Sequence, residues 1–110
     1  GPSRARPIRT VRPRRSPRPV RDTADVLAEL ALFLDKHPKA QFTTINTIAH
    51  FVHFRADNVS EFTATKEAIW QWLDARPTWI EDTGYQIAAW AYDDYRIRLY
   101  GRKDMPMTED

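Results

Sequence analysis

All aromatic residues of this 110-residue chain lie after residue 21. The four Trp, four Tyr and five Phe fall within residues 22–110, whereas residues 1–21 carry few apolar side chains. A segment so poor in apolar surface cannot offset the entropy that it would lose on ordering. We therefore predict a disordered arm over residues 1–21 and one small domain over residues 22–103, followed by a frayed tail over residues 104–110.

Charge divides the chain at the same place. The arm reads "RARPIRTVRPRRSPRPVRD" up to its first acid, and the rest of the chain has nine Lys or Arg against fifteen Asp or Glu. A basic arm on an acidic body indicates a polyanionic partner. The candidate phosphate-binding residues of the arm are its eight arginines, namely Arg4, Arg6, Arg9, Arg12, Arg14, Arg15, Arg18 and Arg21.

The arm admits three interpretations. Its arginines could bind phosphates or enter a narrow minor groove. The arm could instead be a nuclear localisation signal, with Ser16 before Pro17 as a phosphorylation switch. It could also be a solvated tether, and its first three residues, Gly1-Pro2-Ser3, resemble a protease-cleavage remnant.

Composition excludes several classes of function. There is no cysteine, so disulfides, Cys-ligated zinc and thiol catalysis are ruled out. We see no apolar run long enough to span a membrane and no secretory signal, so we expect an intracellular protein, nuclear if eukaryotic and otherwise cytoplasmic. His50 and His53 could supply two metal ligands, but no third ligand is evident. We therefore expect no metal, no cofactor, no small-molecule substrate and no enzymatic activity.

Hydrophobic spacing predicts three helices and then a hairpin. Apolar residues recur at helical spacing in segments 22–38, 43–54 and 60–77, and Pro38 and Pro77 would end the first and third helices. After residue 77 the apolar period changes to two. The expected strands are Gln86–Ala91 and Arg96–Tyr100, joined by a tight turn.

This order resembles a winged helix-turn-helix domain. The resemblance covers residues 22–102 and rests on "FTTINTIAHFV", "SEFTATKEAIWQWLDARP" and "YQIAAWAYDDYRIRLYG". It implies a mainly α fold with a small antiparallel β-hairpin (α+β), in a three-helix winged-helix architecture. It also implies that the third helix enters the major groove and that the hairpin contacts the DNA backbone or minor groove.

The expected recognition helix is poorly suited to that role. Its outward face offers Gln71, with Lys66 at the flank, against Glu67 and Asp74, which phosphates would repel. Trp70 could anchor a protein partner or pack inside the domain. The hairpin is better placed, with basic residues at Arg96, Arg98, Arg102 and Lys103 that suit phosphate contact or edge-strand protection.

Two functions follow from these residues. The first is nucleic-acid binding, with DNA favoured over RNA, through the arm and the basic hairpin of a transcriptional or chromosome-associated regulator. The alternative is a protein-interaction module of a larger complex, in which Trp70 makes the contact and the arm is a tether or localisation signal.

Overall fold

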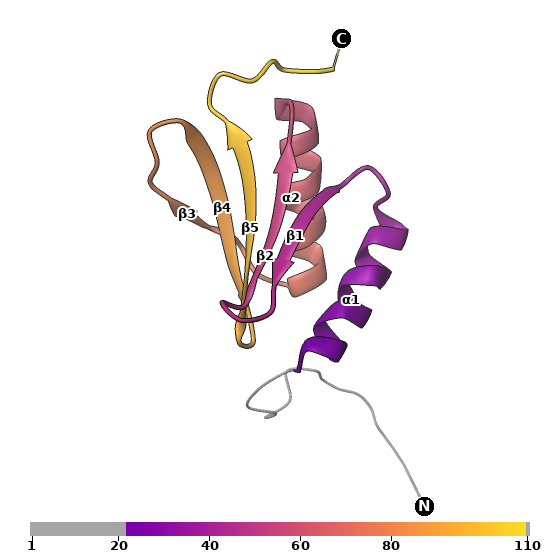
Figure 1. Ribbon diagram of the computed structural model, residues 1–110. Helices are drawn as coiled ribbons and strands as arrows, with labels where there is room; N and C mark the ends of the chain where they lie inside the picture. The colour runs from indigo at the N-terminus through magenta and orange to yellow at the C-terminus, as the bar shows by residue number, and fades with distance from the viewer. Residues whose placement is uncertain (1–21, 110) are drawn as a thin grey trace, which may run out of the picture.

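The computed structural model describes residues 22–109 and contains two helices and one five-stranded mixed sheet (Figure 1). In chain order the elements are α1 (Thr23–Lys36), β1 (Gln41–Asn46), β2 (Phe51–Ala56), α2 (Val59–Leu73), β3 (Thr78–Ile80), β4 (Tyr85–Tyr92) and β5 (Tyr95–Arg102). The strand order is β1-β2-β5-β4-β3. The central pair β2 and β5 is parallel, and every other pair is antiparallel.

Both helices lie on the same side of the sheet (Figure 1). The ring of Phe33 on α1 stacks on Trp72 of α2, with 4.7 Å between centroids, and meets the edge of Phe54 on β2 at 5.6 Å. At the other end of α1, the Thr23 hydroxyl is 2.8 Å from that of the buried Tyr95 on β5. These contacts join the two helices and the two central strands into one core.

The two central strands alternate strictly between core and exterior. On β2 the core side chains are Val52, Phe54 and Ala56, and on β5 they are Tyr95, Ile97 and Leu99, each less than a tenth exposed. Consecutive side chains of a strand point to opposite faces, so burial of this set directs the intervening residues to the other face of the sheet. Within residues 22–109 that second face carries neither helix (Figure 1).

The first helix forms as its sequence predicts. Asp22 caps it by accepting a hydrogen bond from the backbone N–H of Asp25, and Val26, Leu30 and Phe33 are its buried residues. The later helix is also confirmed, but it is shorter than expected. It begins after the buried Asn58, whose side chain accepts from the Glu61 backbone N–H, and ends before Asp74 in the left-handed conformation.

The expected helix over residues 43–54 is wrong, because that segment forms the hairpin of β1 and β2. Ile45, Ile48, Ala49 and Val52 fit a helical stripe, yet Ile48 is 93% exposed in the turn. The turn is stabilised by Asn46, whose side-chain oxygen accepts from the backbone N–H groups of Ile48 and Ala49. The many β-branched and aromatic residues here favour strands.

The later hairpin is confirmed, although its strands extend further, to Tyr85–Tyr92 and Tyr95–Arg102. The short strand β3 was not expected. The three-helix architecture, and with it the winged-helix arrangement, is therefore wrong. Residues 22–109 form an α+β fold in which both helices pack on one face of a five-stranded sheet.

Gly101 and Gly84 provide a matched test of the packing between sheet and helices. A Cβ on Gly101 would lie 2.7 Å from Phe62 and 2.8 Å from Met105, whereas a Cβ on Gly84 would have no atom within 4 Å. We predict that Gly101→Ala lowers the free energy of unfolding by about 1–3 kcal/mol, because the added methyl group would overpack the core. Gly84→Ala should leave it unchanged or slightly raised. Urea unfolding measures both, and equal stabilities would contradict this packing.

Candidate nucleic-acid interface

The face of the sheet opposite the helices, here called the open face, is rich in arginine and aromatic side chains. Alternation places on it Phe51, His53 and Arg55 from β2, Arg96, Arg98, Tyr100 and Arg102 from β5, and Tyr85, Ile87, Ala89 and Ala91 from β4. Four of the nine Lys and Arg residues outside the arm therefore share this one surface. The acidic body thus has a locally basic face.

Flat side chains cross the open face in a continuous series, here called the aromatic row. The row runs through Phe51, His53, Tyr100 and Tyr85. Successive ring centroids are 5.6, 5.1 and 6.2 Å apart. The guanidinium of Arg98 lies 4.6 Å from the Phe51 ring centroid, so it adds a further planar group to the row.

Two polar groups in the row lack hydrogen-bond partners among residues 22–109. They are the Nε2 atom of His53 and the Nε atom of Arg98, and both atoms are buried. Burial, and then the charge of Arg98, lower the pKa of His53 below its usual value. His53 is therefore neutral at pH 7. The row consequently combines an uncharged imidazole with a cationic guanidinium.

The neighbouring strand β4 contributes short side chains. Ala91 lies directly across from Arg96, and Ala89 lies across from Arg98. These alanines leave the flanks of the two arginines unobstructed on that side. Arg96 is exposed and Arg98 is partly exposed.

A hollow of about 690 Å³ lies at the end of the open face where β2 and β5 finish and β4 begins. Its lining includes Tyr85 and Tyr100 of the aromatic row, together with Arg55, Asp57 and Arg102. The hollow therefore extends the aromatic row into a concave site that is lined by both positively and negatively charged side chains.

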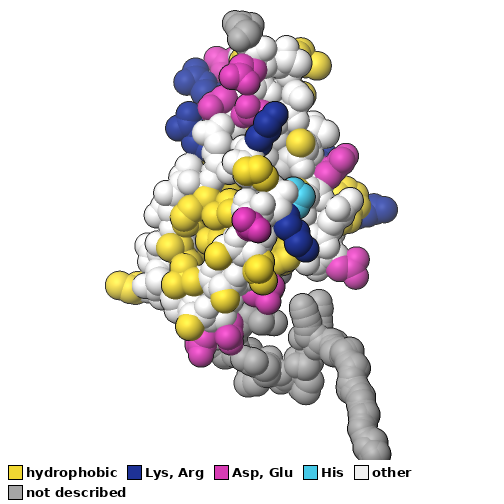
Figure 2. Space-filling view, turned by 90° about the vertical axis from the view of Figure 1, so that its right-hand side faces the viewer, with side chains coloured by type: hydrophobic (Ala, Val, Ile, Leu, Met, Phe, Trp, Pro, Cys, Tyr) yellow, Lys and Arg dark blue, Asp and Glu magenta, His cyan; other side chains and the backbone are white. Residues whose placement is uncertain are grey.

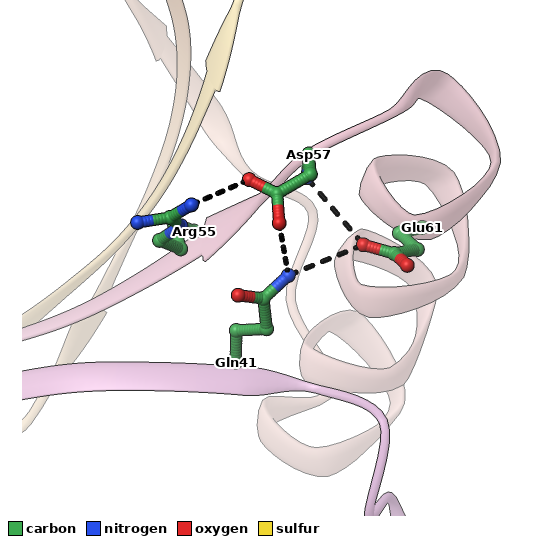
Figure 3. A network of polar contacts seen from close by, with 4 residues as sticks. All are labelled: Gln41, Arg55, Asp57 and Glu61. Carbon is green, nitrogen blue, oxygen red and sulfur yellow. Dashed lines mark hydrogen bonds and ion pairs between the residues drawn. The ribbon is translucent and has the colours of Figure 1, made fainter. Parts of the chain in front are cut away.

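A polar network fixes the Asp57 side of this hollow (Figure 3). The Asp57 carboxylate accepts from Arg55 at 2.7 Å and from the Gln41 amide nitrogen at 2.9 Å. The same Gln41 nitrogen donates to Glu61 at 3.2 Å. The hydrogen bonds from Gln41 and then Arg55 lower the pKa of Asp57, so its carboxylate stays ionised at neutral pH.

The structure brings together only some of the candidate residues from the sequence. Arg96 and Arg98 share the open face, as alternation along the strand predicted, and Arg102, expected just beyond the strand, lies on the same face within β5. Lys103 lies beyond β5, and its ammonium donates to the backbone oxygen of Asp82. The arginines of the arm lie outside the described residues.

The helix candidates lie apart from the open face. Lys66 sits over the Trp79 ring at 5.7 Å, and Gln71 is exposed beside Trp72. Trp70 is half-buried, with the Arg76 guanidinium 5.6 Å from its ring centroid. None of these three residues contributes to the aromatic row.

Sequence reasoning missed Phe51, Arg55, Tyr85 and Tyr100 as site residues and considered His53 only as a metal ligand. The sequence pattern places Phe51 and His53 in a helix and Arg55 in the polar segment after it, which concealed their common direction. The signal that could have found them is the alternation in "FVHFRA", where Val52, Phe54 and Ala56 are buried and the intervening residues are not. That alternation matches the one already recognised in "YRIRLYGR".

A second surface is apolar rather than basic. Figure 2 looks onto the side of the molecule that carries α1 and shows hydrophobic side chains gathered there. On α1 the exposed apolar residues are Ala24, Leu27, Ala28, Ala31 and Leu32, and Leu32 is 61% exposed. This helix therefore has one apolar face in the core and another at the surface.

Comparisons with protein families, curated proteins and solved structures found no match. Neither helix of residues 22–109 is long and apolar enough to cross a membrane. The same residues contain no group of three or more His, Asp or Glu that could hold a metal ion. His50 and His53 occupy a turn and a strand, and His50 lies 3.5 Å from Asp94.

His53 should make stability depend on pH. Its folded-state pKa is lowered, so as pH falls through about 6.5 the unfolded chain takes up a proton that the folded chain does not. We predict that the free energy of unfolding falls on acidification, and falls less in His53→Gln. Urea unfolding near neutral pH and one or two units below measures this, with His37 and His50 present in both proteins. An equal loss in both proteins would contradict the assigned environment.

Proposed function

We propose that this protein binds single-stranded nucleic acid on the open face of its sheet. The observation that carries the proposal is the aromatic row flanked by Arg96, Arg98 and Arg102. Proteins that bind single strands combine stacking side chains with a basic groove along the backbone. In this arrangement bases stack on Tyr100, Tyr85 and the Arg98 guanidinium, and the arginines contact phosphates.

Flat groups on an open sheet favour a single strand over a duplex. In a duplex the bases already stack on one another, and their faces are not accessible to protein side chains. Duplex readers usually insert a helix with basic and amide side chains into the major groove. Here the outward side of α2 includes the exposed Glu67, and the exposed Asp74 follows its last turn, so this helix does not suit that role.

The arm can add affinity without adding selectivity. Its eight arginines would contact phosphates in addition to those bound at the open face. Phosphate contacts position a protein but do not read bases, so these contacts would raise affinity and leave selectivity unchanged. Each phosphate neutralised on a single strand contributes about −0.7 to the slope of log affinity against log salt. Replacing the arm arginines by glutamine in the full chain should therefore reduce the salt slope and retain base stacking.

A second candidate function is protein binding through α1. The exposed Leu27 and Leu32, with the alanines between them, favour this alternative, because exposed apolar patches commonly mark interaction sites. If it is the main function, substitutions on the open face leave the affinity of the full chain for single-stranded oligonucleotides unchanged, because the arginines of the arm alone supply that affinity. The alternative then explains the apolar face of α1 and leaves the open face without a ligand.

Two substitutions test the open face directly. We predict that Tyr100→Ala weakens binding to a fluorescent octathymidylate by about 1–3 kcal/mol, because one stacking surface is lost. Arg98→Ala should weaken binding and lower the salt slope by about 0.7, because one phosphate contact is lost. Fluorescence anisotropy at two salt concentrations measures both effects, with circular dichroism to verify folding.

Matched controls come from the side of the molecule that faces the helices. Trp79→Ala removes a half-exposed aromatic side chain that stacks on Phe62, and Arg76→Ala removes an arginine beside Trp70. Both should leave affinity for the oligonucleotide within about twofold of the original protein, a difference well below the value of one stacking contact. If the controls weaken binding as much as the open-face variants do, the site is wrongly placed.

A further inference from the structure

The hollow at the end of the aromatic row differs in charge from the rest of the open face. Arg96 lies at the other end of the face and Arg98 near its middle. The hollow is lined by Arg55 and Arg102, but also by Asp57 and Asp82. The two carboxylates balance the two arginines, so the hollow has no excess positive charge to attract a phosphate. The hollow therefore suits a base better than a phosphate.

Its size and walls also fit a base. Ligand sites in proteins have volumes of about 300–1,000 Å³, and this hollow of about 690 Å³ lies within that range. Tyr85 and Tyr100 line it with rings that meet nearly edge to face, at 83°. Tyr85 is 42% exposed, so its ring is accessible to a stacked base. A base from a strand lying along the row can enter the hollow without leaving the open face.

Asp57 supplies the hydrogen-bonding preference. Each of its two oxygens accepts one hydrogen bond within the network of Figure 3, and a carboxylate oxygen can accept a second. The Asp57 side chain is 53% exposed, so these remaining positions are accessible. Two adjacent acceptors match a base edge that has two adjacent N–H donors.

Only guanine among the common bases has such an edge, formed by N1–H and the 2-amino group, and it places the O6 acceptor beside them. Arg55, held by Asp57 through one nitrogen, has further donors for that oxygen. We propose that the hollow is a guanine-selective subsite of the single-strand site, with Asp57 as acceptor, Arg55 as donor, and Tyr85 and Tyr100 as stacking partners. This inference rests on the proposed function.

The test compares three fluorescent octanucleotides with the full chain by anisotropy. One is octathymidylate, one carries a single central guanosine, and one carries inosine there, which lacks only the 2-amino donor. A bidentate contact discriminates between bases by about tenfold or more, so guanosine should raise affinity by about that factor. Inosine should lose most of the gain. Equal affinities for octathymidylate and the guanosine octamer would overturn the subsite while leaving the proposed function standing.

Asp57→Asn and Asp104→Asn form the matched pair of variants. Each substitution removes one exposed carboxylate that is paired with an arginine, but only Asp57 lines the hollow. The readout is the ratio of affinities for the guanosine octamer and octathymidylate, because each substitution also frees an arginine of the open face. Asp57→Asn should reduce this ratio to about one, and Asp104→Asn should leave it about tenfold, as in the original protein. A guanosine advantage that survives Asp57→Asn would overturn the assignment. Failure of every octamer to bind would overturn the proposed function as well.

Discussion

Burial of one face of the two central strands is the constraint on which the rest of this structure depends. Val52 and Phe54 on β2 lie beside Ile97 and Leu99 on β5, and these four side chains are almost completely inaccessible to solvent. Because side chains alternate along a strand, this core directs Arg98 and Tyr100 outward in register with His53 and Arg55. The composition of the open face is thus a consequence of how the core packs.

The helices complete this arrangement without taking part in the proposed site. Phe33 connects α1 to α2 and to β2, while the buried Tyr95 connects the beginning of β5 to Thr23. The network around Asp57 also links the start of β1 and the end of β2 to the first turn of α2. Glu61 in that turn accepts from the Asp57 backbone N–H and from Gln41, so α2 helps to position the Asp57 carboxylate without lining the hollow itself.

Part of this outcome could be predicted from the sequence. The apolar spacing of residues 22–38 and the terminating Pro38 identified α1, and the alternation around Ile97 and Leu99 identified the last hairpin with its basic face. The segment 43–54 was misassigned because its apolar residues satisfy both periods. The pairing of β2 with β5 decides between the helical and the strand period. That pairing joins residues more than 40 positions apart. The partnership of His53 and Arg98 depends on that non-local contact, and so could not be predicted from local sequence.

The most direct measurement of the central claim is a titration with octathymidylate followed by the backbone amide NMR signals of the full chain. Binding on the open face should shift signals from β2, β4 and β5, above all around His53, Arg98 and Tyr100, while the exposed residues of α1 remain unchanged. Shifts confined to α1 and α2, or no shifts at low salt, would contradict the account.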